Sequence, residues 1–411
     1  MKVLHINTSD KVGGAAIAAF RLHDAMLSTG IDSKYLVLNR TINDRNDIAT
    51  ISKHKNFINR MLNIVLEKIA TKNMGKIKGL FSSFKYGICI SKRREVNEAD
   101  IIYIHWINSF VNYHELKKIL KKKKPVFWFM HDMFAITGGC HYSFDCVNYY
   151  VQCRKCPFHS KGIDQSKEQY NKKRKIYKQF NNLVFITPSK WLFDCAKKSE
   201  LTENKQVYHI PNLIDKTVFK SINKNVAREL FSLNNNAKII GFGANSALTN
   251  FYKGWDYLKD ALQILSKDET LQDKKIEILI FGSNYSKEIA DSLPFPVHFL
   301  GHLHDDCSLV MAYNCMDVFV IPSIAENFPN TILESLSCNT PVVGFDTGGI
   351  NDTVNANTGY LTEYRNSSDL ARGVSVILKE GRENVYEYTK TFNVKAVLDK
   401  HVKMWKTEGV L

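Results

Sequence analysis

Several features that define other classes of protein are missing from this sequence of 411 residues. No stretch approaches the roughly 20 consecutive apolar residues that a transmembrane helix needs. The start, Met1 to Asn7, is too polar and too short for a signal peptide, so we expect a cytoplasmic protein. We find no nucleic-acid-binding motif, internal repeat or low-complexity tract. Since 44% of the residues are hydrophobic and 24% charged, the composition is that of an ordinary globular protein.

The charge of the sequence is unevenly distributed. Its 56 lysines and arginines and 41 acidic residues give a net charge of +15. Residues 1–200 hold 35 of the basic and 16 of the acidic residues, so this half carries +19 and the remainder −4. A basic half is typical of a solvated surface, and equally of a surface that binds an anionic membrane.

The hydrophobic pattern alternates strands with helices. Apolar runs without polar alternation indicate strands covered by helices on both faces of a parallel sheet. Such runs are Val3–Ile6, Lys34–Leu38, Ile101–His105, Val126–Met130, Leu183–Thr187, Val207–Ile210, Ala237–Phe242, Ile276–Phe281, Val297–Leu300, Val318–Ile321 and Pro341–Phe345. The pattern predicts an α/β protein with two doubly wound domains, divided near the turn-forming pair Pro211-Asn212.

One basic segment, residues 53–78, interrupts this rhythm. It has seven lysines and arginines and a single acid, Glu67, and Ile58, Leu62, Val65 and Ile69 recur at helical spacing. This pattern predicts an amphipathic helix. Its apolar side either lies in the headgroup region of a membrane or packs on the sheet, and the sequence favours neither.

Small residues follow the first strand of each predicted domain. Gly13-Gly14 comes after the first, and Gly243 and Phe281-Gly282 close strands in the second half. In open α/β sheets, ligands bind at the edge where the carboxyl ends of the strands lie, and a helix that starts at this edge attracts phosphate. Lys253 before Gly254 is a suitable cation for phosphate. Tight turns and a solvated lysine explain the same residues without a ligand.

The stretch from Ile321 to Glu334 is the most informative. A strand ends, a loop carries Glu326, and a helix begins near Asn330 with Glu334 inside it. The helix start at Asn330 and Thr331 suits a diphosphate, whereas carboxylates suit the hydroxyls of a sugar. The alternative is that Glu334 only stabilises the first turn of its helix.

Histidines and cysteines supply two further candidates. His105 and His131-Asp132 end neighbouring strands, which indicates a site at that edge. Four cysteines within 17 residues, with His141 and His159 nearby, fit a structural zinc site, free thiols or disulfides. The four are Cys140, Cys146, Cys153 and Cys156.

In this order, the motifs resemble the retaining glycosyltransferases of family 4, and the segment that begins Thr137-Gly138-Gly139 is similar to a subgroup from bacterial surface-polysaccharide clusters. The resemblance runs along essentially the whole chain. It rests on Gly13-Gly14, His131-Asp132, Pro188–Trp191, Ile210–Asp215, Lys253-Gly254, Glu326 and Glu334 with seven residues between them, Thr340–Val343 and Gly348-Gly349.

The resemblance implies a GT-B fold, in which two Rossmann-like domains face each other across a cleft. Residues 1–210 with about 390–411 would be the acceptor-side domain, and 211–389 the nucleotide-sugar domain. The helix Asn393–Trp405 would return to the first domain. The implied cofactor-free reaction transfers a sugar from a UDP- or GDP-sugar to a saccharide acceptor, lipid-linked, at the inner face of the plasma membrane. The alternative is a non-catalytic basic protein that binds anionic membrane or polysaccharide.

The resemblance also implies the role of each site residue. His131, Glu326 and Lys253 would be the catalytic group, with Glu326 on the sugar hydroxyls and Lys253 on the diphosphate. Glu334 would hold the ribose. The other donor contacts would be Gly13, Gly14, Gly243, Phe281, Gly282, Asn327, Phe328, Pro329, Asn330 and Thr331.

The sequence departs from the family at two places. An arginine is usual about six residues before the lysine that matches Lys253, but residues 241–252 contain no arginine or lysine. Asn327 stands where a glycine is common. No D-x-D pair is present to hold a metal on the donor, so we expect metal-independent transfer by front-face attack on the sugar.

Overall fold

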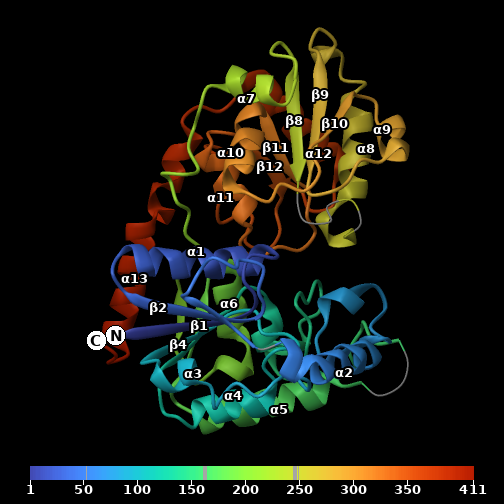
Figure 1. Cartoon of the computed structure of the whole chain (residues 1–411). Coiled ribbons are helices and arrows are strands. Elements are labelled where there is room, and N and C mark those ends of the chain that lie inside the picture. Colours follow the sequence, from blue (N-terminus) through green and yellow to red (C-terminus); the bar gives the residue numbers. More distant parts are fainter. Residues whose placement is uncertain (52, 161–163, 244–247, 249) are drawn as a thin grey trace. The chain divides into compact units, whose positions relative to one another are not determined.

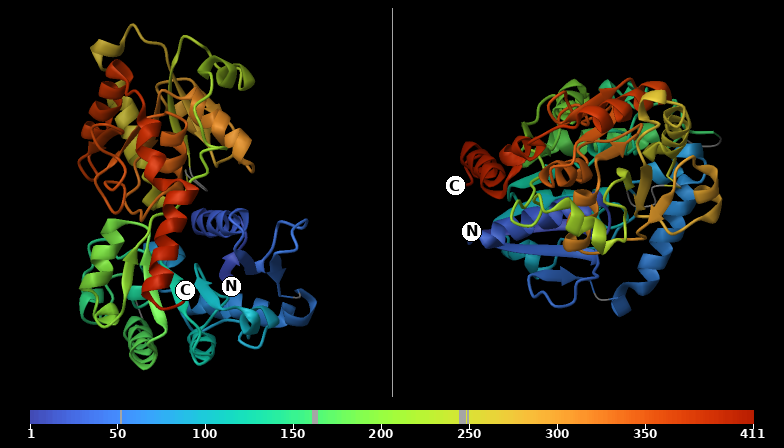
Figure 2. Two further views of the ribbon diagram at one scale, coloured as in Figure 1. Left: turned by 90° about the vertical axis from the view of Figure 1, so that its left-hand side faces the viewer. Right: turned by 90° about the horizontal axis from the view of Figure 1, so that it is seen from above.

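The computed structural model describes all residues except 52, 161–163, 244–247 and 249. The side chains of 53–60, 76, 78 and 79 are also outside the description. The segment that lacks the family's arginine therefore lies partly outside it. The chain forms two compact units, Met1–Asn212 with Val397–Leu411, and Leu213–Ala396 (Figures 1 and 2).

Unit 1 contains a seven-stranded sheet in the order β3-β2-β1-β4-β5-β6-β7. All of its strand pairs are parallel. The strands are β1 Lys2–Ser9, β2 Asp32–Asn39, β3 Ile48–Thr50, β4 Ile101–Ile104, β5 Val126–Phe129, β6 Leu183–Thr187 and β7 Val207–His209. The helices are α1 Gly14–Ser28, α2 Lys53–Thr71, α3 Arg94–Glu98, α4 Tyr113–Leu120, α5 Ser166–Gln179, α6 Lys190–Lys198 and α13 Val394–Thr407, whose first three residues belong to unit 2.

Unit 2 contains a six-stranded parallel sheet in the order β10-β9-β8-β11-β12-β13. Its strands are β8 Lys238–Gly243, β9 Ile276–Phe281, β10 Val297–Phe299, β11 Val318–Ile321, β12 Val342–Phe345 and β13 Gly359–Thr362. Its helices are α7 Lys224–Leu230, α8 Trp255–Leu265, α9 Lys287–Ser292, α10 Asp306–Cys315, α11 Asn330–Ser337 and α12 Ser367–Glu380. Both units are therefore Rossmann-like, and the predicted fold class is confirmed.

The strand order of each sheet reverses at its first strand. β1 lies between β2 and β4, and β8 lies between β9 and β11. At such a reversal the two following connections leave in opposite directions and open a crevice at the carboxyl ends of the strands. The turn after β1, the segment 250–253 after β8 and the loop after β11 follow these strands. The candidate site residues lie mainly on these loops.

Helix α13 packs on the unit 1 sheet. The indole Nε1 of Trp405 donates to the hydroxyl of Tyr103 at 2.8 Å, and that hydroxyl is 2.9 Å from Nδ1 of His401. Trp405 and Tyr103 are fully buried. The other face of the same sheet carries the apolar core formed with α4 and α5, so both faces are covered as the apolar strands predicted.

Helix α2 packs with its polar side and exposes its apolar side. Asn63 Nδ2 donates to the carbonyl of Gly87 at 3.1 Å, and the Glu67 carboxylate accepts hydrogen bonds from Ser83. The large apolar residues on the same stretch of the helix are 38–56% exposed: Met61, Leu62, Ile64, Val65, Leu66 and Ile69. In the part of α2 whose side chains are described, the interpretation that its apolar side packs on the sheet is therefore wrong. Among the described residues, no helix is long and apolar enough to cross a membrane.

Candidate functional site

The loop after β11 carries Glu326, and Lys253 lies against it. Lys253 Nζ is 2.5 Å from Oε1 of Glu326, and Ser323 Oγ donates to the same oxygen at 3.1 Å. The two charged side chains are only 18% and 8% exposed. Burial alone would lower the pKa of Lys253, but the charge and hydrogen bond of Glu326 outweigh burial and raise it. The two residues therefore form a buried ion pair.

Two glycines allow the backbone approach that forms this pair. Gly254 has φ 73°, and a Cβ there would lie 1.8 Å from the carbonyl oxygen of Pro322. Gly348 has φ 58°, and a Cβ there would lie 1.8 Å from the carbonyl oxygen of Glu326. Only glycine tolerates both the left-handed conformation and the contact. The Lys253-Gly254 turn is thus held against the loop of Glu326 by backbone packing.

Helix α11 begins directly after this loop, and Glu334 lies in its second turn. Pro329 precedes the helix, and no side chain caps the helix start. The first turn of α11, all of which the structure describes, contains no acidic residue. The buried carboxylate of Glu334 accepts a hydrogen bond from the Tyr313 hydroxyl at 2.9 Å. Glu334 is therefore not a first-turn charge, and the positive end of the helix dipole lies at Asn330 and Thr331.

The segment between Glu326 and α11 is buried. Asn327 and Phe328 are 2% and 7% exposed, and the Phe328 ring lies 5.7 Å from that of Phe392. Asn330 is buried, and Pro329 and Thr331 are half-buried. The core thus fixes the backbone of this predicted donor-binding loop.

The residues predicted at the ends of β8 and β9 support the site from the core. Phe281 is buried, with its ring 5.6 Å from that of Tyr313, the partner of Glu334. A Cβ on Gly243 would come within 2.3 Å of the Phe281 ring, so packing requires the glycine. Gly282 has φ 79°. The side chain of Phe281 therefore packs against Tyr313, which in turn binds Glu334.

In unit 1, the turn after β1 is open. Gly13 has φ 93°, and a Cβ on Gly13 or Gly14 would meet no described atom within 4 Å. Asp10 anchors this turn: its carboxylate accepts from the backbone N–H of Thr41 at 2.5 Å and of Ile42 at 2.8 Å. Burial would raise the pKa of Asp10, but these N–H donors lower it.

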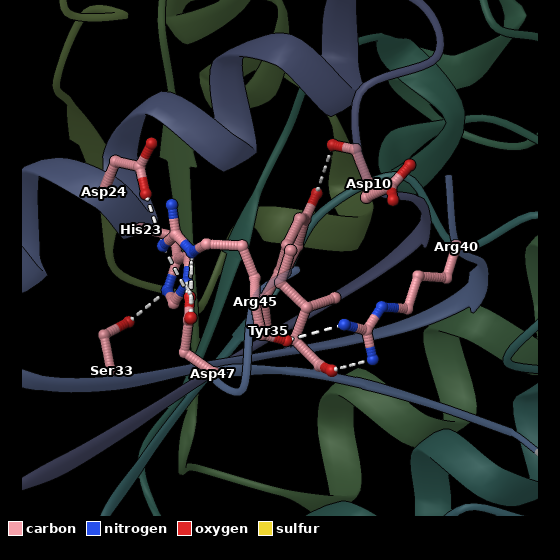
Figure 3. Close-up of polar contacts among 9 residues, drawn as sticks. Asp10, His23, Asp24, Ser33, Tyr35, Arg40, Arg45 and Asp47 are labelled. Carbon is pink, nitrogen blue, oxygen red and sulfur yellow. Dashed lines mark hydrogen bonds and ion pairs between the residues drawn. The ribbon is translucent and has the colours of Figure 1, made fainter. Parts of the chain in front are cut away.

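A second polar network holds α1 to the segment before β3 (Figure 3). His23 on α1 lies with Nδ1 2.7 Å from Ser33 Oγ and Nε2 2.7 Å from an Asp47 carboxylate oxygen. Arg45 bridges Asp47 and Asp24. Neither this network nor the role of Asp10 was predicted from the sequence. The only signal in the sequence is polar residues next to buried strands.

His131, the predicted histidine at the end of β5, begins a chain of three imidazoles. Its Nε2 is 2.9 Å from Nδ1 of His105, and Nε2 of His105 is 2.9 Å from Nδ1 of His5. His5 and His105 are buried and His131 is half-buried. Burial lowers the pKa of all three, that of His131 to about 4, so the rings are neutral at pH 7.

Asp132 is bound to a different histidine. Its Oδ2 is 2.5 Å from Nδ1 of His141, and Nε2 of His141 is 3.0 Å from Nδ2 of Asn108. Burial would raise the pKa of Asp132, but the charge and hydrogen bond of His141 lower it. His141, which lies near the four cysteines in the sequence, is therefore bound to Asp132 in the structure.

The four clustered cysteines are free thiols. Cys140 and Cys156 hydrogen-bond to each other, which lowers the pKa of Cys156 to about 7 and raises that of Cys140. The thiol of Cys153 accepts from the Gly138 N–H at 3.1 Å. Among the described residues, no group of three or more potential ligands is arranged to hold a metal ion. The zinc hypothesis therefore rests on the sequence spacing alone.

Two Rossmann-like units define a protein of GT-B fold, and solved structures of that kind align with nearly the whole chain. Sucrose-phosphate synthase from Thermosynechococcus elongatus aligns with a TM-score of 0.65 at 16% identity, over 99% of this chain and 98% of that one. HepE of Anabaena, in complex with UDP and glucose, aligns with a TM-score of 0.62 at 15% identity, over 99% and 100%. At these identities the likeness concerns the fold.

Sequence comparisons find glycosyltransferases that are similar to this chain. Residues 238–380 match the family described as glycosyl transferases group 1. The putative colanic acid biosynthesis glycosyl transferase WcaC of Escherichia coli is 26% identical over 84% of this chain and 82% of its own length. The N,N'-diacetylbacillosaminyl-diphospho-undecaprenol alpha-1,3-N-acetylgalactosaminyltransferase of Campylobacter jejuni is 34% identical over 27% of this chain and 30% of its own. Residues 238–380, which lie in unit 2, are therefore similar to the group 1 glycosyltransferases.

Proposed function

We propose that this chain transfers a glycosyl group, with retention of configuration, from a UDP- or GDP-sugar to a lipid-linked saccharide in the synthesis of a bacterial surface polysaccharide. The observation that carries the proposal is the buried pair of Lys253 and Glu326, with Glu326 on the loop that leads into α11. The names of two relatives, which specify colanic acid and a diphospho-undecaprenol-linked acceptor, support the acceptor class.

The charged groups of this site suit two different parts of the donor. A diphosphate is anionic, so it suits the Lys253 ammonium and the N–H groups at Asn330 and Thr331. A carboxylate repels phosphate but accepts hydrogen bonds from hydroxyls. Glu326 therefore takes the transferred sugar and Glu334 the ribose. In unit 1, we assign substrate contacts to His131 and to the open turn at Gly13-Gly14.

The reaction needs no enzymic nucleophile in this account. The acceptor hydroxyl attacks the anomeric carbon on the face that the diphosphate leaves, so one C–O bond forms as another breaks. The departing phosphate oxygen takes the acceptor's proton. Lys253 and the α11 dipole stabilise the charge that develops on the diphosphate, and the rest of the site positions the two reactants.

A transfer assay over a panel of nucleotide sugars tests the proposal. We expect Glu326→Gln to lower transfer about 100-fold, the scale for loss of one preorganised polar contact. Glu277→Gln is the matched control, because Glu277 is equally buried in unit 2 and is bound to His298 at 2.9 Å. Full activity in Glu326→Gln would overturn the site, and no sugar release from any donor would favour the non-catalytic alternative. NMR of the product should show the donor's anomeric configuration.

We further propose that the exposed face of α2 brings the protein to an anionic membrane, where a lipid-linked acceptor lies. Because α2 binds unit 1 through Asn63 and Glu67, its apolar side is left for the bilayer interior. The basic residues of segment 53–78 suit the phosphates of the headgroups.

Vesicle flotation tests the membrane proposal. Vesicles of phosphatidylglycerol should carry the protein at low salt, and Leu62→Glu with Val65→Glu should abolish flotation. The matched control is Val226→Glu with Leu230→Glu, which places charges on two exposed apolar residues of α7. Equal flotation of both variants would contradict a role for α2.

A further inference from the structure

The chain of three histidines has two possible hydrogen-bond directions. Each neutral imidazole carries one proton, so the two contacts, His131 with His105 and His105 with His5, must be donated in the same sense. Either every ring donates outward, from His5 toward His131, or every ring donates inward. The inward direction places a proton on Nε2 of His5. The outward direction places a proton on Nδ1 of His131.

The surroundings of His5, at the buried end of the histidine chain, distinguish between the two hydrogen-bond directions. Nε2 of His5 is fully buried, and none of the described residues forms a hydrogen bond with it. A buried N–H without an acceptor is among the rarest defects in native proteins, whereas an acceptor without a donor is less so. The inward direction would create that N–H, and the outward direction avoids it. His5 therefore donates from Nδ1 to His105, and His105 donates from Nδ1 to His131.

We propose that His5 and His105 are positioning residues that fix His131 as the tautomer protonated on Nδ1. His131 then meets its ligand as a hydrogen-bond donor. None of the described residues bonds to its Nδ1, and the ring is partly exposed at the carboxyl end of β5. The neighbouring Asp132 is occupied by His141.

A donor at Nδ1 suits an oxygen of the sugar or of the acceptor. It does not suit removal of a proton, because the only nitrogen of His131 with a lone pair already accepts from His105. This ligand assignment rests on the proposed function. Since His131 cannot take the acceptor's proton, that proton passes to the departing phosphate oxygen in the proposed reaction.

The tautomer can be measured without any donor or activity. In the full chain with ¹⁵N-labelled histidine rings, the His131 signals are identified by their loss in His131→Asn. We expect a protonated Nδ1 and an unprotonated Nε2. In His5→Asp, the carboxylate can only accept, so His105 must donate from Nε2 and protonation of His131 should shift toward Nε2. His5→Asn should restore the wild-type pattern, because its amide nitrogen can donate from nearly the same place.

Kinetics provide the second readout. His5→Asp should lower kcat about tenfold, which is the value of one ordinary hydrogen bond, and His5→Asn should keep most of the wild-type kcat. A wild-type His131 protonated on Nε2 would overturn the inference, as would an unchanged tautomer in His5→Asp. If the tautomers behave as expected but no nucleotide sugar is ever turned over, the proposed function fails while the histidine chain stands.

Discussion

The ammonium of Lys253 and the carboxylate of Glu326 are 2.5 Å apart although 73 residues separate them in the sequence. Each is therefore the other's partner, and a bound donor must replace this contact with two: phosphate on Lys253 and a hydroxyl on Glu326. A buried pair of this kind is costly to break from one side, because the remaining charge has no counter-charge.

Removal of the lysine alone should destabilise the protein more than removal of both charges. We expect Lys253→Met to cost about 3 kcal/mol of unfolding free energy, and Lys253→Met with Glu326→Gln to recover most of that cost. Urea unfolding measures both. Lys275→Met should cost under about 1 kcal/mol, because Lys275, which pairs with Glu277, is 58% exposed. A double variant no more stable than the single one would contradict the buried pair.

The Gly254 turn should be needed for activity as well as for stability. Alanine at Gly254 or Gly381 meets a positive φ, of 73° and 68°, so each variant should lose at least about 1 kcal/mol. Only at Gly254 does the new Cβ strike backbone, at Pro322, and displace Lys253. We therefore expect transfer to fall at least about tenfold in Gly254→Ala alone. Equal activities of the two variants would show that this approach does not position the lysine.

Mild acid should destabilise the native protein through its buried histidines. Burial lowers the pKa of His5, His105, His131 and His401 below the ordinary value, to about 4 for His131 and about 3 for His401. The unfolded chain therefore binds more protons than the native protein below about pH 6.5, and the free energy of unfolding falls as pH drops from there toward 4. Its slope should reach at least about four protons, because burial also lowers the pKa of His23 and His209, and it should be smaller by about one in His401→Gln. Urea unfolding between pH 7 and pH 5 measures it, and no slope would contradict burial of the neutral rings.

The thiol of Cys156 should be the reactive member of the cysteine cluster. Because the hydrogen bond from Cys140 lowers the pKa of Cys156 to about 7, alkylation by iodoacetamide should rise with a midpoint near that pH. Cys140→Ala should move the midpoint upward, and peptide mass spectrometry identifies the labelled residue. The same samples should be assayed for zinc. Stoichiometric metal, with all four thiols protected, would instead support the zinc site.

The fold was predictable because the parallel strands are buried on both faces. Every apolar run named from the sequence overlaps a strand of the structure, since helices cover both sides of the sheet and no strand needs polar alternation. The two strands not predicted, Ile48–Thr50 and Gly359–Thr362, are short, and the second begins with glycine. They lie at sheet edges, where little apolar sequence is needed.

The site was predictable in its residue types but not in its partners. Spacing places Glu326 before a helix and Lys253 after a strand, yet only the tertiary structure joins them through the Gly254 and Gly348 contacts. The histidine chain was hidden for the same reason: His5 lies 100 residues from His105, and strand order decides that they meet. Contacts of such sequence separation leave no local signal.

The most direct test of the account is titration calorimetry of the full chain with a nucleotide sugar and with the matching nucleotide diphosphate. If Glu326 holds the sugar hydroxyls, wild-type protein should bind the nucleotide sugar more tightly, by about tenfold for each good hydrogen bond to a charged group. Glu326→Ala should lose this preference and still bind the diphosphate. Undiminished preference for the nucleotide sugar in Glu326→Ala would contradict the account.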